Sequence, residues 1–132
     1  MNGETIEMST ANFNEVIENN DIVLLDFWAD WCGPCKMFGP IFEKAAKDNP
    51  DLAFGKVDTE AQQELAAQFG ISSIPTLGIF REKILLFLQP GMLPENALKD
   101  IIQQVKDLDM EEVRKKVAEQ QAAKADGKVQ TN

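Results

Sequence analysis

The chain has 132 residues, of which 44% are hydrophobic, and this length suits one domain with its own hydrophobic core. The net charge of −9 argues against nucleic acid as a partner, because phosphate contacts need clustered Lys and Arg, and it also disfavours anionic lipid surfaces. No apolar stretch approaches the ~20 residues of a membrane span, and the first residues lack the pattern of a signal peptide. We therefore expect a cytoplasmic protein that does not contact membranes.

Short apolar runs alternate with amphipathic segments along the chain. The expected strands cover residues 6–8, 22–28, 52–58, 77–80 and 84–88. The expected helices cover residues 11–18, 36–49, 62–68 and 94–108. Ser9 and Thr10 are the expected N-cap of the first helix, and Gly70 is the expected stop of the third. The turn at 81–83 lacks Asn-Gly, so the sequence does not indicate a two-residue hairpin loop with positive φ there.

The order of these elements predicts the fold. Residues 22–28 are almost continuously apolar, which is typical of a central strand covered on both faces. The helix that follows carries an expected core-facing stripe of Met37, Phe38, Ile41, Phe42 and Ala45. Alternating strands and helices favour parallel pairing, and the late hairpin adds antiparallel pairing. We expect an α/β fold with a central mixed five-stranded sheet flanked by four helices.

The composition changes near residue 109. Residues 1–108 form the expected domain, and residues 109–132 form a charged extension. Val113 and Val117 prolong a weak helical pattern, so the extension is expected to begin as a helix. From Ala122 to Asn132 we expect a frayed polar tail.

Both cysteines, Cys32 and Cys35, follow the central strand and flank a Gly-Pro pair. They offer a metal ion only two ligands, and the chain contains no histidine to complete a set of four, so no metal site is expected. The missing histidine also excludes Ser-His-Asp and Cys-His nucleophiles. The loop that such a pair would close is too short to stabilise the fold appreciably. A chemically reactive dithiol is the interpretation that is left.

Several separated motifs resemble the thioredoxin family over residues 5–108. The segment from Trp31 to Lys36 reads Trp-Cys-Gly-Pro-Cys-Lys and carries the strongest part of the resemblance. The other matches are Asp26, Phe27-Trp28-Ala29, Pro40, Lys56-Val57-Asp58, Ile74-Pro75-Thr76 and Gly91. The resemblance implies the thioredoxin fold.

The resemblance also implies roles for the residues around the dithiol. Cys32 is the expected nucleophile, because the start of a helix favours a thiolate, and Cys35 is the expected resolving thiol. Asp26 lies in an apolar strand where burial disfavours its charge, and it is the expected proton acceptor. Gly33 and Pro34 permit the tight turn between the cysteines.

Two further sets of residues complete the expected site. Lys56 resembles the family lysine beside the aspartate and is expected to tune it, although an exposed strand lysine is an equal alternative. Pro75 resembles the family's cis-proline. The expected substrate-binding residues form an apolar patch around Cys32: Trp31, Ile74, Pro75, Gly91 and Met92.

The functional expectation is a thiol-disulfide oxidoreductase that reduces protein disulfides through a reversible Cys32–Cys35 disulfide. It needs no bound cofactor, and the family implies electrons from an NADPH-dependent thioredoxin reductase. The expected partners are that reductase and disulfide-containing proteins, and the chain is expected to be a monomer. Two alternatives stay open: an oxidase or isomerase in an oxidising compartment, and a redox-independent binding or chaperone-like module that uses the patch around Trp31 and Pro75.

Overall fold

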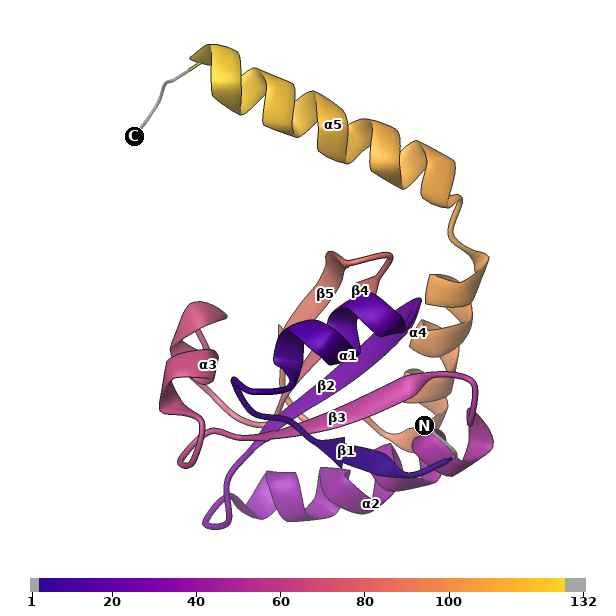
Figure 1. Cartoon of the computed structure of the whole chain (residues 1–132). Helices are drawn as coiled ribbons and strands as arrows, with labels where there is room; N and C mark the ends of the chain where they lie inside the picture. The colour runs from indigo at the N-terminus through magenta and orange to yellow at the C-terminus, as the bar shows by residue number, and fades with distance from the viewer. Residues whose placement is uncertain (1–2, 128–132) are drawn as a thin grey trace. The chain divides into compact units, whose positions relative to one another are not determined.

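A five-stranded mixed sheet lies at the centre of the computed structural model, which describes residues 3–127 (Figure 1). The strands are ordered β1-β3-β2-β4-β5 across the sheet. Strands β1 and β2 each pair in parallel with β3, whereas β4 pairs antiparallel with both β2 and β5. The strands are β1 (Thr5–Glu7), β2 (Ile22–Trp28), β3 (Ala53–Asp58), β4 (Thr76–Arg81) and β5 (Ile84–Pro90). The predicted mixed five-stranded sheet is confirmed, and so is the span of the central strand β2.

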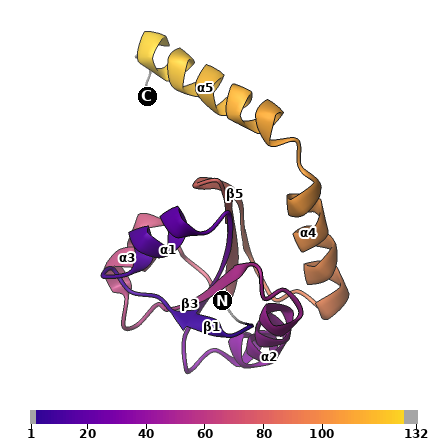
Figure 2. The ribbon, with the colours of Figure 1, turned by 45° about the vertical axis from the view of Figure 1, so that its right-hand side comes forward.

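Helices cover both faces of the sheet (Figure 2). Across the described residues the helices are α1 (Phe13–Asn19), α2 (Gly33–Asp48), α3 (Gln63–Gln68), α4 (Glu95–Asp107) and α5 (Met110–Gly127). The strand β2 is buried along nearly its whole length because α1 and α3 lie over one face and α2 lies over the other. This double burial explains why its sequence is apolar on both faces instead of alternating.

The two faces of the sheet have separate aromatic cores. On the side of α1 and α3, Phe13 and Phe27 both pack against Phe69, with ring centroids 5.6 Å and 5.5 Å away. On the side of α2, Phe42 packs edge-on against Phe54 of β3 with centroids 5.3 Å apart. Each fully buried side chain of this kind contributes about 1.5–3 kcal/mol to folding. The contact between Phe42 and Phe54 holds α2, and the cysteines at its start, against the sheet.

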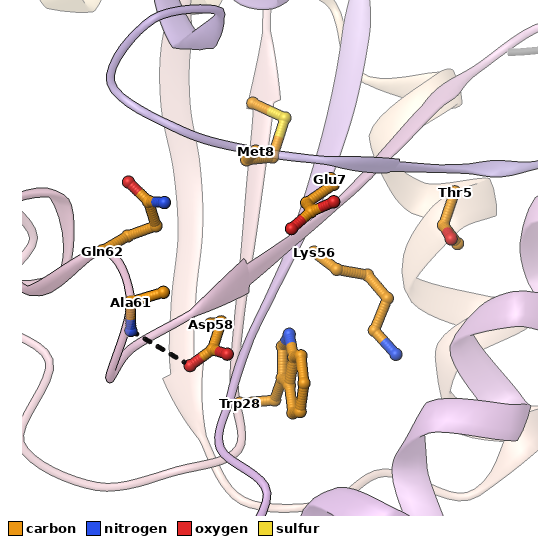
Figure 3. Close-up of a pocket in the computed structure, with 8 residues that line it drawn as sticks. All are labelled: Thr5, Glu7, Met8, Trp28, Lys56, Asp58, Ala61 and Gln62. Carbon is orange, nitrogen blue, oxygen red and sulfur yellow. Dashed lines mark hydrogen bonds between the residues drawn. The ribbon is translucent and has the colours of Figure 1, made fainter.

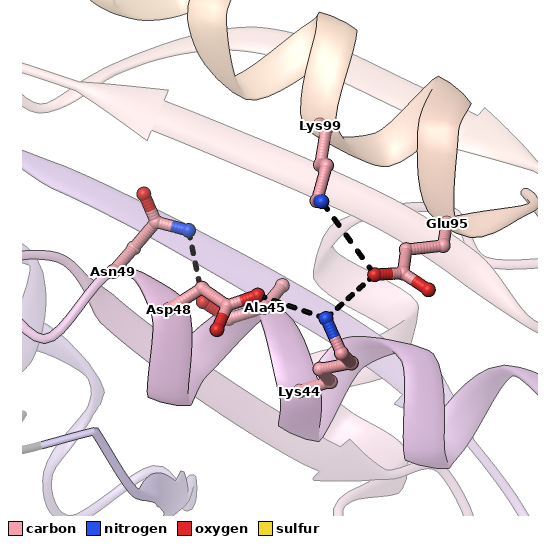
Figure 4. A network of polar contacts seen from close by, with 6 residues as sticks. All are labelled: Lys44, Ala45, Asp48, Asn49, Glu95 and Lys99. Atoms are coloured by element: carbon pink, nitrogen blue, oxygen red, sulfur yellow. Dashed lines mark hydrogen bonds and ion pairs between the residues drawn. The ribbon is translucent and has the colours of Figure 1, made fainter.

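An exposed network of charges joins α2 to the first turn of α4 (Figure 4). The Lys44 ammonium lies 2.7 Å from a carboxylate oxygen of Glu95 and 3.2 Å from one of Asp48. Lys99 lies 3.7 Å from the same oxygen of Glu95. Hydrogen bonds to Glu95 and Asp48 raise the pKa of Lys44, and the Lys44 ammonium lowers the pKa of Glu95. The network links the first turn of α4 to the C-terminal half of α2.

One local prediction is wrong, and one local feature is not indicated by the sequence. Ser9 and Thr10 do not cap α1: the helix begins at Phe13 with Asn12 as its N-cap, and the Ser9 carbonyl instead accepts hydrogen bonds in a preceding turn. The hairpin between β4 and β5 does have a two-residue loop with positive φ, at Glu82 (53°) and Lys83 (68°). A tertiary contact stabilises this loop, because the Glu82 N–H donates to the Asp21 carbonyl at 2.8 Å.

The chain divides into two units, Met1–Lys99 and Asp100–Asn132, and the division falls within α4. In the second unit, α5 is one helix from Met110 to Gly127, so part of the segment expected to be a frayed tail is helical. Residues 128–132, which belong to the same expectation, lie outside the described residues. Val113 and Val117 are half-buried in α5.

Candidate redox site

The two cysteines lie at the junction between β2 and α2. The strand ends at Trp28, and Cys32 is the N-cap of α2 with an extended backbone. The Cys35 backbone N–H donates to the Cys32 sulfur at 3.1 Å, which is the position that a capping side chain takes at the start of a helix. Pro34 lies in the first turn, where its missing N–H leaves no intrahelical bond unmade.

Cys32 and Cys35 form a disulfide, with Cα atoms 5.2 Å apart. Each residue is only 4% exposed, so the bond is shielded on most sides. When the bond is reduced, the unpaired N–H groups and the positive end of the α2 dipole favour a thiolate at Cys32 over one at Cys35, which lies further inside the helix. The geometry therefore suits a pair with one attacking and one internal sulfur.

Asp26 is a buried carboxyl in the middle of β2. It is 1% exposed, and neither of its oxygens has a hydrogen-bond partner among the described residues. Burial raises the pKa of Asp26 to about 7, the Lys56 ammonium opposes this rise, and Glu43 adds to it. A carboxyl whose pKa lies near neutrality can both take and release a proton under physiological conditions.

Lys56 lies beside Asp26 in the sheet but points to other groups. The two residues are register partners in the parallel pair of β2 and β3. The Lys56 ammonium lies 3.3 Å from a Glu43 carboxylate oxygen and 5.1 Å from the centre of the Trp28 ring. Figure 3 shows Lys56 and Trp28 side by side in a pocket of about 340 Å³. The ammonium is thus held between α2 and the indole.

The segment around Pro75 lies against the disulfide. The Ile74–Pro75 peptide bond is cis, as the sequence predicts. The Cys32 sulfur lies 3.6 Å from the Ile74 carbonyl oxygen. The Gly91 N–H donates to the Pro75 carbonyl at 2.7 Å, and Gly91 has a φ of 107°, which favours glycine. The Ile74 segment thus reaches the Cys32 sulfur, and the loop at Gly91 is joined to that segment through Pro75.

The expected apolar patch is only partly on the surface. Trp31 is 69% exposed, and its indole N–H donates to a Glu60 carboxylate oxygen at 3.4 Å. The other members differ in exposure: Gly91 is exposed, Ile74 and Met92 are half-buried, and Pro75 is buried. Gly33 and Pro34, in the turn between the cysteines, are exposed as well. Pro75 thus contributes little exposed surface to the patch.

Sequence reasoning misplaced one residue near the site and overlooked two others. Met37, expected in the core-facing stripe of α2, is 63% exposed. Glu60, which anchors Trp31, and Glu43, which pairs with Lys56, had no role in the expected site. Both are charged residues in exposed segments, and a single sequence offers no signal that distinguishes them from ordinary surface charges.

Comparison with known proteins agrees with this geometry. The family model described as Thioredoxin matches residues 4–104, which is most of the chain. The chain belongs to the thioredoxin family. It is a thiol-disulfide oxidoreductase that carries its own redox-active disulfide, Cys32–Cys35. Within residues 3–127, no group of three or more metal-binding side chains is close enough to hold an ion, and no helix is long and apolar enough to span a membrane.

Three relatives illustrate the similarity. A Streptomyces coelicolor protein provisionally named thioredoxin 2 is 65% identical over 118 residues, covering 89% of this chain and 88% of its own. A mutant thioredoxin from Halobacterium salinarum is 36% identical with a TM-score of 0.76, covering 81% of this chain and 95% of its own. A thioredoxin f2 structure, solved with ferredoxin:thioredoxin reductase, is 26% identical with a TM-score of 0.73, covering 80% of this chain and 97% of its own.

The Streptomyces match extends beyond the family domain. An aligned stretch covering 89% of a 132-residue chain cannot end at residue 108, whatever its starting point. Part of α5 therefore has a counterpart in that relative.

Proposed function

We propose that this protein reduces protein disulfides, with Cys32 as the attacking sulfur and Cys35 as the resolving sulfur. The observation that supports this assignment is the place of the Cys32 sulfur at the N-terminus of α2, where it accepts the Cys35 N–H at 3.1 Å. Such a position lowers the pKa of a thiol and stabilises the thiolate, which is the species that attacks disulfides. Gly33 and Pro34 supply the tight turn that sets the two sulfurs within bonding distance.

The proposed reaction begins with the reduced pair. The Cys32 thiolate attacks one sulfur of a substrate disulfide, which forms a mixed disulfide and expels the other substrate sulfur as a thiolate. Asp26 then accepts the proton of the Cys35 thiol, and the resulting thiolate attacks the Cys32 sulfur. The Cys32–Cys35 disulfide forms, the second substrate sulfur leaves, and two electrons have passed from the protein to the substrate.

The patch of Trp31, Ile74, Pro75, Gly91 and Met92 is the proposed substrate contact. Exposed Trp31 supplies apolar area next to Cys32, and a surface of this kind suits a partner chain. The Ile74 carbonyl, 3.6 Å from the Cys32 sulfur, is the proposed hydrogen-bond acceptor for the backbone of an extended substrate. Lys56 is the proposed tuning residue for Asp26, since the two are register partners.

The source of electrons, the location and the oligomeric state are part of the same proposal. We propose re-reduction by an NADPH-dependent thioredoxin reductase, a cytoplasmic location and a monomeric state. The complex of thioredoxin f2 with a reductase supports a reductase as a class of partner. We also propose that residues 1–108 are the redox domain and that residues 109–132 are an extension to it.

Insulin reduction tests the assignment of the cysteines. With dithiothreitol as electron donor, the wild-type protein is expected to accelerate insulin precipitation, while Cys32→Ser is expected to lose all acceleration. Retained turnover in Cys32→Ser would contradict the proposal.

A redox titration of the cysteine pair tests the direction of electron flow. The reference potential for thioredoxin is about −270 mV, while that of protein disulfide isomerase is about −180 mV and that of DsbA is about −120 mV. A value near the first supports a reductase, and a value near either of the others supports the isomerase or oxidase alternative. If a Cys32→Ser, Cys35→Ser double variant still performs the biological role, that role belongs to a redox-independent binding module.

A further inference from the structure

A surface pocket of about 250 Å³ reaches the inner cysteine. Its wall includes Cys35, Gly39 and Glu43 of α2 and, from the sheet, Trp28 and Lys56. The proposed resolving sulfur and the oppositely charged side chains of Glu43 and Lys56 therefore line the same pocket. The acidic member of that pair is Glu43, which takes no part in the sulfur chemistry itself.

Three contacts define the position of the Lys56 ammonium. Its nitrogen lies 3.3 Å from a Glu43 carboxylate oxygen and 5.1 Å from the centre of the Trp28 ring. It also lies close to α2 at Gly39, where an added Cβ would be 3.7 Å from the nitrogen. Lys56 is only partly exposed, with 23% of its side chain accessible, whereas Glu43 is 54% exposed. Among these three neighbours of the ammonium, Glu43 is the one that carries a charge. Its negative charge therefore partly cancels the electrostatic effect of the ammonium on nearby groups.

Asp26 is the buried group that this charge pair faces. Successive side chains of a strand alternate between faces, so Asp26 and Trp28 share the face of β2 that α2 covers, and Lys56 is the register partner of Asp26 in β3. In β4 the register partner of Asp26 is Leu77, which carries no charge. Asp30 and Lys36 line the pocket as well, from the loop before α2 and from its first turn. Glu43 and Lys56 are the charged groups that act on the Asp26 carboxyl, and they act in opposite directions.

We propose that Glu43 is a positioning residue for the resolving step. It holds the Lys56 ammonium against Trp28 at the pocket beside Cys35, and its negative charge offsets that of the ammonium at Asp26. Asp26 thereby remains basic enough to take the Cys35 proton near neutral pH. The inference rests on the proposed role of Asp26 as proton acceptor and adds to it the group that sets the proton affinity of Asp26.

The physical argument predicts a direction. Removing the Glu43 charge leaves the Lys56 ammonium without its counter-charge and removes a repulsion that disfavours ionised Asp26. The pKa of Asp26 then falls, and Asp26 becomes a weaker base. The loss of one charge that acts on Asp26 through partly solvated surroundings is expected to move the titration midpoint of Asp26 by about half a pH unit or more.

Carbon NMR of the Asp26 carboxyl tests this directly on the full-length oxidised protein. In Glu43→Gln, the titration midpoint is expected to lie below the wild-type value of about 7 by about half a pH unit or more. Asp48→Asn is the matched control, because it removes an exposed carboxylate from the same helix outside the pocket, and its midpoint is expected to match the wild type. An unchanged or higher midpoint in Glu43→Gln overturns the inference.

Two further measurements separate this inference from the proposed function. In a Lys56→Met background, Glu43→Gln is expected to move the Asp26 midpoint less, because no ammonium is left for Glu43 to offset. Equal shifts in both backgrounds overturn the claim that Glu43 acts through Lys56. The acidic limb of the insulin-reduction pH profile is expected to move in Glu43→Gln by the same amount as the midpoint. If Asp26→Asn leaves that profile intact, the proton-acceptor role fails, whereas the NMR midpoint of Glu43→Gln still reports on the charge pair.

Discussion

Replacing Asp26 by asparagine is expected to stabilise the protein by an amount that grows with pH. The folded-state pKa of Asp26, about 7, lies above its ordinary value of 3.8, so the folded protein disfavours ionisation of this carboxyl. Stability from the protonated carboxyl is fully present below about pH 4 and is lost as pH rises through about 7. The difference between the two values corresponds to about 4 kcal/mol when the carboxyl is fully ionised. The amide of the Asp26→Asn variant does not ionise, so the variant avoids this loss.

The pH dependence of the difference is more informative than its size at one pH. At pH 9 the free energy of unfolding of the variant is expected to exceed that of the wild type by about 4 kcal/mol, and at pH 5 by about 2 kcal/mol, apart from a constant offset for exchanging a neutral carboxyl for an amide. Guanidinium unfolding of the oxidised proteins measures both values without interference from thiol titration. Asp51→Asn, which removes an exposed carboxylate from a turn, controls for net charge. An advantage of Asp26→Asn that is equal at both pH values would refute the assigned ionisation of Asp26.

Three other predictions concern packing and substrate contact. Phe42→Ala is expected to lower the free energy of unfolding by about 3–5 kcal/mol in denaturant titrations, because the ring is fully buried against Phe54. Gly55→Ala is expected to cost about 1–3 kcal/mol in the same assay, since its new Cβ would lie 2.6 Å from the buried Met8 side chain. Trp31→Ala is expected to raise the KM for insulin about tenfold while the unfolding free energy stays within about 0.5 kcal/mol, because Trp31 is mostly exposed; an unchanged KM would remove Trp31 from the substrate surface.

The parts of the fold that the sequence predicted have strong local signals. The apolar run at 22–28 predicted β2 with its bounds, because a strand covered on both faces leaves few polar positions. Gly70 ends α3 with a φ of 63°, a conformation that glycine adopts without strain. The hairpin loop at Glu82 and Lys83 was missed because neither residue prefers positive φ. The loop depends on its contact with Asp21, which lies far away in the sequence.

The same distinction applies to the candidate site. The cysteines and the cis bond before Pro75 could be predicted from a resemblance in local motifs. The convergence of Ile74 and Gly91 on the site depends on tertiary contacts between loops. Glu43 has its place only because α2 packs over Lys56, and helical periodicity alone assigns such a residue to the solvent.

Trapping the mixed disulfide tests the central claim most directly. Cys35→Ser, reduced and then mixed with a disulfide-linked peptide dimer, is expected to retain one peptide on Cys32, as measured by intact-mass spectrometry and peptide mapping. Without the resolving sulfur the adduct cannot be released by the internal attack. Cys32→Ser is expected to form an adduct at Cys35 at least about tenfold more slowly, because that sulfur lies inside the helix and not at its start. Equal rates of adduct formation in the two variants would contradict the assignment of Cys32 as the attacking sulfur.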